Sequence, residues 1–115
     1  MAKLECDLEG DFDEILDAVD KGVSRSISAA EEATSYFHGD DCRIVVRVYE
    51  RYSFFGGNRV SLTFTLCKIG KRLTCSAISA GGSQAVFFKL NTFGEETFLS
   101  VVEKALEPYR KRSEY

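Results

Sequence analysis

Two runs of alternating side chains surround a glycine-rich break within residues 42–67, and this pattern limits the possible folds more than any other feature. The first run has aliphatic side chains on one face and arginines on the other, because neighbouring strand residues point to opposite sides. Ile44, Val46 and Val48 form the aliphatic face, and Val45 and Tyr49 lie among the arginines of the other. The second run, residues 59–67, alternates apolar residues with Ser and Thr. With Gly56-Gly57-Asn58 between them, the two runs predict an antiparallel hairpin.

The rest of the chain predicts further strands and two amphipathic helices. Further strands are expected at residues 2–8, 28–37 and 72–80, with a short additional one left open at 85–90. Asp11 and Glu14 have capping-box spacing and begin a helix from about 12 to about 26. Thr92 and Glu95 repeat that spacing before a final helix, which should stop or kink near Pro108. The predicted order is β-α-β-β-β-β-α.

Strands joined by short turns pair antiparallel, so the expected fold class is α+β. We expect a two-layer sandwich in which both helices lie on the apolar face of the sheet, with Ile44, Val46 and Val48 turned toward them. The 115 residues suit a single domain, residues 1–115.

Charge is distributed unevenly along the chain. Residues 1–41 hold 12 acidic and 3 basic side chains, net −9, whereas residues 42–94 hold 1 acidic and 8 basic, net +7. We expect these parts to attract each other within one fold or across a dimer. The total of −3 makes nucleic acid an unfavoured partner.

Four cysteines occur without a C-x-x-C motif or a histidine cluster, which argues against zinc and for free thiols in a reducing cytoplasm. Cys67 and Cys75 are placed to approach each other across the turn at Gly70. No apolar run has the length of a signal peptide core or a membrane span, so no membrane partner is expected.

Two local clusters raise the question of chemistry. His38, Asp40, Asp41 and Cys42 could ligate a metal or supply a Cys–His nucleophile, but one local turn rarely completes either geometry, and a polar turn is favoured. Residues 79–84, SAGGSQ, include Ser83 and Gln84 and suggest a phosphate loop. The run that follows is strand-like, whereas a phosphate loop requires a helix N-terminus, so a close-packed turn is favoured.

A cationic sheet face is the main candidate binding surface. Its expected outward-facing residues are Arg43, Arg47, Tyr49, Arg51 and Arg59. Guanidinium groups match phosphate oxygens, and an aromatic ring can stack a base. The alternatives are a solvated face with Arg–Tyr stacking or a face covered by a second copy. Phe55, at the hairpin end, is a further candidate contact, although a bend stiffened by aromatic side chains is the favoured explanation.

The stretches RVYERYSFFGGNRVSL and SAISAGGSQAVFFKLNTFGEETFL resemble signature segments of a small family of bacterial proteins described as a domain of unknown function. The resemblance covers nearly the whole chain. It implies a stand-alone bacterial cytosolic protein and carries no catalytic motif. The element order is similar, more loosely, to a helix-grip domain, which often holds an apolar ligand between helix and sheet, although this chain is short for a large cavity.

We therefore expect a non-enzymatic domain that binds a small ligand or a protein partner and self-associates as a homodimer. It would use the arginine-bearing face or the 79–84 turn. The alternatives are a small enzyme centred on His38 and Cys42, or a weak binder of polyanions or nucleic acid. No cofactor, metal or assigned catalytic residue is expected.

Overall fold

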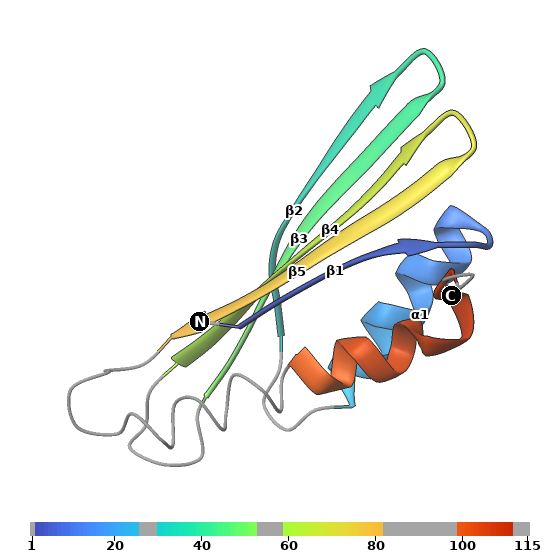
Figure 1. The fold of residues 1–115 in the computed structure, drawn as a ribbon. Coiled ribbons are helices and arrows are strands. Elements are labelled where there is room, and N and C mark those ends of the chain that lie inside the picture. The colour runs from blue at the N-terminus through green and yellow to red at the C-terminus, as the bar shows by residue number, and fades with distance from the viewer. Residues whose placement is uncertain (1, 26–29, 53–58, 82–98, 112–115) are drawn as a thin grey trace.

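The structure, a computed structural model, describes residues 2–25, 30–52, 59–81 and 99–111. It contains an antiparallel sheet with two α-helices on one side, which confirms the predicted α+β two-layer fold (Figure 1). The named elements are β1 (Ala2–Leu8), α1 (Phe12–Ser24), β2 (Ala30–Gly39), β3 (Cys42–Tyr52), β4 (Arg59–Ile69), β5 (Arg72–Gly81) and the 3₁₀ turn η1 (Glu107–Tyr109). The second α-helix, called here the C-terminal helix, is described over residues 99–106.

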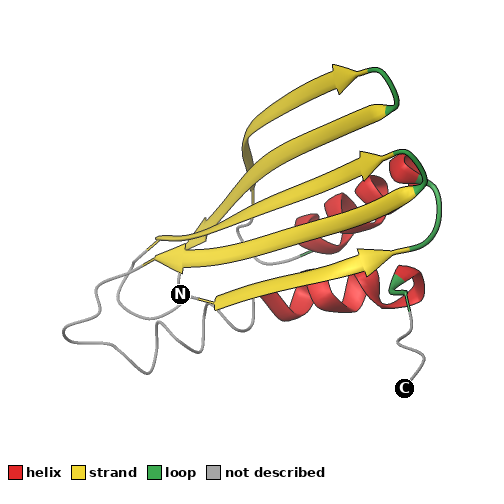
Figure 2. Cartoon of the chain, turned by 45° about the horizontal axis from the view of Figure 1, so that its top comes forward, coloured by secondary structure: helices red, strands yellow, loops and turns green. Residues whose placement is uncertain are grey.

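The sheet has the strand order β1-β5-β4-β3-β2, and every neighbouring pair is antiparallel. Strands β2 to β5 follow one another through the chain, and β1 lies beside the last of them. Figure 2 shows the strands as one layer with the helices behind a single face. No helix in the described part of the chain is long and apolar enough to cross a membrane.

Helix α1 begins where the capping pattern predicts. The Asp11 side chain accepts a hydrogen bond from the Glu14 backbone N–H at 3.0 Å, which satisfies one of the unpaired donors of the first turn. One face of the helix is buried: Phe12, Ile15, Leu16, Val19 and Val23. That stripe turns α1 toward the sheet, while its acidic residues lie along the other side and at its borders.

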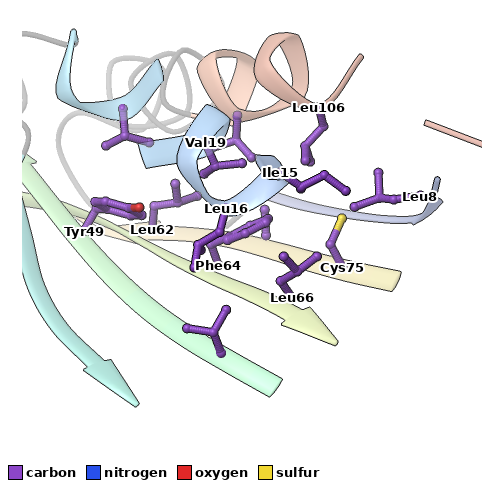
Figure 3. Close-up of a cluster of buried hydrophobic side chains, with 14 of the residues drawn as sticks. Leu8, Ile15, Leu16, Val19, Tyr49, Leu62, Phe64, Leu66, Cys75 and Leu106 are labelled. Carbon is purple, nitrogen blue, oxygen red and sulfur yellow. The ribbon is translucent and has the colours of Figure 1, made fainter. Parts of the chain in front are cut away.

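The hydrophobic core fills the space between this helix and the sheet (Figure 3). Four alternate residues of β4, Val60, Leu62, Phe64 and Leu66, are fully buried. The C-terminal helix adds Val102 and Leu106, both fully buried. Gly22 lets the two helices approach closely, because a Cβ at that position would lie 3.3 Å from the Ala105 Cβ.

The predicted faces of β3 are wrong. Val45, Arg47 and Tyr49 are buried on the helix side, whereas Ile44, Val46 and Val48 lie on the opposite side and are half-buried. The cause is register: Arg47 pairs with Phe64, and residues paired across antiparallel strands share a face. Because the apolar residues of β4 face the helices, the odd-numbered residues of β3 must do so too.

The cysteine prediction is also wrong. Cys75 lies opposite Leu66, and Cys67 lies opposite Thr74, so the two thiols are on different faces of the sheet. Cys75 instead lies opposite Cys6 of β1.

The C-terminal helix ends near Pro108, as predicted. Its α-helical part gives way to the 3₁₀ turn at Glu107. The expected short strand at 85–90, the bend at 56–58 and the capping box at 92–95 lie outside the described residues.

Candidate interaction surface

Arg47 is the centre of a polar network between α1, β2 and β3. The residue as a whole is 8% exposed, and its guanidinium donates to Thr34 Oγ1 at 3.1 Å and to Tyr36 Oη at 2.8 Å. It also forms ion pairs with Asp20 at 3.6 Å and Glu31 at 3.5 Å. A buried guanidinium requires partners of this kind, because an unpaired buried charge is strongly destabilising. Arg47 therefore joins the sheet to α1 and is not available to an external anion.

Arg43 is occupied in the same way at the start of α1. Its guanidinium carbon lies 4.1 Å from the centre of the Phe12 ring, and its two terminal nitrogens donate to Asp13 at 3.0 and 3.4 Å. The hydrogen bond from Arg43 lowers the pKa of the Asp13 carboxyl. The acidic helix and the basic strand thus attract each other within one fold, which is one of the two arrangements expected from the charge distribution.

Tyr49 completes the inward-facing set. Its ring is 2% exposed, and its hydroxyl donates to Asp20 Oδ1 at 3.1 Å. Burial raises the pKa of Tyr49 far above its ordinary value, so this hydroxyl remains a donor. Its function here is to hold α1 on the sheet.

The remaining predicted site residues do not share one face of the sheet. Arg51 lies opposite Val60 and therefore shares the helix-side face, where burial lowers the pKa of its guanidinium. Arg59 lies on the other face and donates to Glu50 at 2.8 Å. Phe55, Ser83 and Gln84 lie outside the described residues. The predicted outward-facing surface of arginines is therefore wrong. Arg43, Arg47 and Arg51 lie on the helix side of the sheet, and Arg59 lies on the opposite side.

The side of the sheet that faces away from the helices has a different character, and we call it the open sheet face. No described helix or loop covers it (Figure 2). Its centre carries no charged side chain, and consists of Ala33, Ser35, Phe37, Cys42, Ile44, Val46, Val48, Ser61, Thr63, Thr65, Cys67, Ile69, Thr74, Ser76, Ile78 and Ala80. Phe37 is 56% exposed and Ile69 is 60% exposed. Charged residues of the same face lie at its ends or along β1, as in Glu50 and Glu5.

The size of this face can be estimated from strand geometry. β3 has 11 residues. At a rise of about 3.3 Å per residue and about 4.8 Å between strands, β2 to β5 present roughly 700 Å². A standard protein interface buries about 800 Å² per partner, with a charge-depleted centre and a polar rim. The open sheet face matches this in extent and in composition.

Surface hollows occur near the turns between strands. One of about 700 Å³ is lined by Lys68, Lys71, Arg72 and Lys111, but also by Asp7 and Glu9. Its Arg72 is paired with Asp7 at 3.4 Å. The mixed charges favour neither an anionic nor a cationic ligand.

The His38 and Cys42 side chains do not form a catalytic pair. Gly39 lies opposite Cys42 and His38 lies opposite Arg43, so the imidazole is on the helix side and the thiol is on the open sheet face. Both residues line a hollow of about 230 Å³, yet no hydrogen bond between them is seen in the described chain. Nor do the described residues contain a group of three or more His, Cys, Asp or Glu side chains arranged to hold a metal ion.

Of the turn at 79–84, only Ser79 to Gly81 is described. Ser79 is fully buried, and its hydroxyl makes no hydrogen bond within the part of the chain that the structure describes. Gly81 has φ +154°, and a Cβ there would clash with the Arg59 carbonyl oxygen. This close backbone approach supports a tightly packed strand end at Gly81.

Sequence reasoning missed the open sheet face because it assigned Ile44, Val46 and Val48 to the core. A signal was present in the charges. Helix α1 carries Asp13, Asp17 and Asp20, and a helix rich in aspartate is a favourable neighbour for the arginines of β3.

The comparisons with known proteins identify a family but no function. No curated protein and no solved structure matches the chain. A family model described as "Family of unknown function" matches residues 1–110, which confirms the resemblance seen in the sequence. With nearly its whole length matched, the chain belongs to this family of unknown function, DUF6054.

Proposed function

We propose that this chain is a non-enzymatic interaction domain that binds a second copy of itself through the open sheet face. The observation that carries the proposal is the stripe of Ile44, Val46 and Val48, which lies on a face left uncovered by the described elements. Antiparallel sheets with one solvated face usually place their polar residues on that face, whereas β3 places Ile44, Val46 and Val48 there and turns its arginines toward the helices. An uncharged surface with partly exposed apolar residues at its centre is typical of interaction sites.

A second copy is the favoured partner for two reasons. The centre of the face is uncharged, so two copies related by a two-fold axis would meet without like-charge repulsion, although each chain carries a formal charge of −3. In addition, the roughly 700 Å² available per copy approaches the area of a standard interface. Two such sheets can stack face to face at about 10 Å.

The domain is proposed to act in a reducing compartment such as the bacterial cytoplasm. Its four cysteines are free thiols, which supports that location. We favour a protein partner over a small ligand. The guanidinium groups of Arg43 and Arg47 already form ion pairs with aspartates of α1, so they are not available to a small ligand.

The test is the molar mass in solution of the wild type and of two charge variants. Val46→Glu places a carboxylate at the centre of the proposed interface, and Ser100→Glu adds the same charge to an exposed position of the C-terminal helix. Sedimentation equilibrium should give a dimer for the wild type and for Ser100→Glu, and a monomer for Val46→Glu. Circular dichroism verifies that both variants are folded.

A wild type that remains monomeric at the highest accessible concentration would refute the proposal. A folded Val46→Glu variant that dimerises as tightly as the wild type would also refute it, since the interface would then lie elsewhere.

A further inference from the structure

Cys6 and Cys75 form a close thiol pair that the proposed interface does not use. They are direct partners in the pairing of β1 with β5, and their sulfur atoms are 3.3 Å apart. Directly opposed residues of antiparallel strands have Cα separations of about 4.5–5.5 Å, within the range that a disulfide spans. The two sulfurs can therefore be joined without moving the strands.

The other two cysteines provide an internal comparison. Cys67 lies opposite Ile44, and Cys42 lies opposite Ile69, so these thiols are diagonal neighbours on the open sheet face. Diagonal side chains are separated by about 7–8 Å, which is beyond the reach of a disulfide in an undistorted sheet. Geometry thus distinguishes one pair from the other.

We propose that Cys6 and Cys75 are a reversible redox modification site that takes a low-molecular-weight disulfide as its oxidant. Cys6 is half-buried on the outermost strand, whereas Cys75 is 4% exposed. The first reaction therefore occurs at Cys6, which loses its proton and attacks one sulfur of the small disulfide. A mixed disulfide forms on Cys6, and the first small thiolate leaves and takes up a proton.

Cys75 completes the exchange. It loses its proton to solvent and attacks Cys6 Sγ, the bond from Cys6 to the small thiol breaks, and the second small thiolate leaves and is protonated. Overall, two protein thiols are oxidised to one disulfide, and one small disulfide is reduced to two thiols. Burial raises the pKa of Cys75 to about 12, which leaves the first attack on the small disulfide to Cys6.

The position of β1 gives the bond a structural consequence. The segment after the C-terminal helix is attached to this strand: Glu9 N–H donates to the Tyr109 carbonyl at 2.7 Å, and Lys111 N–H donates to the Asp7 carbonyl at 3.0 Å. Helix α1 follows the same strand directly. A Cys6–Cys75 bond would therefore fix to β5 a strand that leads into α1 and that holds the segment after the C-terminal helix.

The experiment equilibrates the full chain with an excess of oxidised over reduced glutathione, alkylates the remaining thiols and measures the intact mass. We expect two alkylated thiols where the reduced protein has four, and a non-reducing peptide map that joins Cys6 to Cys75. The Cys42→Ser/Cys67→Ser variant should oxidise equally, whereas Cys75→Ser should stop with one glutathione on Cys6. The oxidised form should unfold roughly 10–20 °C above the reduced form, because the bond closes a long loop of the unfolded chain.

Four alkylated thiols in wild type after equilibration would overturn the proposal. So would a peptide map in which the disulfide includes Cys42 or Cys67. The Cys42→Ser/Cys67→Ser variant keeps the test decisive even if Cys75→Ser fails to fold, since neither of its changed residues is buried.

Discussion

Replacing Arg47 with methionine should destabilise the fold by about 2–3 kcal/mol. Removing one member of a buried ion pair costs about 3–5 kcal/mol when the remaining charge stays buried. Here Arg47 itself is 10% exposed at its side chain, but the carboxylates of Asp20 and Glu31 are each 45% exposed and regain water, which reduces the expected loss. Methionine keeps an apolar stem of similar length, so the change reports mainly on the polar network.

Thermal unfolding followed by circular dichroism is the assay. A domain of 115 residues loses roughly 4 °C in melting temperature for each kcal/mol, so Arg47→Met should melt about 8–12 °C below the wild type. Arg72→Met is the matched control, because the Arg72 side chain is 73% exposed and its pair with Asp7 should contribute under about 1 kcal/mol. If Arg47→Met melted within 2 °C of that control, the network would be a surface feature and our account of how α1 is held would be refuted.

Three further predictions test other parts of the structure. Gly81→Ala should lower the unfolding free energy in urea by more than about 2 kcal/mol, because the new Cβ would clash with the Arg59 carbonyl; a neutral result would mean that this strand end is loose. Ser79→Ala should raise the melting temperature by a few degrees, since it removes a buried hydroxyl that has no hydrogen-bond partner; a loss of about 1 kcal/mol or more would show that the hydroxyl has one. The carboxyl of Asp13 has a lowered pKa in the folded state, so its pairing with Arg43 stabilises the fold above the unfolded-state pKa of this carboxyl and is lost as the pH falls through the folded value. Acid unfolding of Asp13→Asn should accordingly show a smaller loss of stability between neutral and low pH than wild type, and an identical pH profile would contradict this.

Much of the fold could be predicted because local patterns were strong. The strand at residues 2–8 matches β1 at both ends, and the cap at Asp11 places the start of α1 correctly. The hairpin of β3 and β4 was recognisable from period-two alternation. The site could not be predicted in the same way, because both faces of β3 carry apolar residues and alternation alone does not say which face is buried.

The order of secondary structure and the opposite charges of its parts were therefore properties of the sequence alone, since capping, periodicity and turn residues act over a few neighbouring positions. The tertiary structure decided which face of β3 became core. Pairing with β4 aligned Arg47 with Phe64, and the aspartates of α1 made an arginine acceptable under a helix. The pairing of β3 with β4, together with the helix packed on one side of the sheet, turned the arginines inward and left Ile44, Val46 and Val48 on the open sheet face.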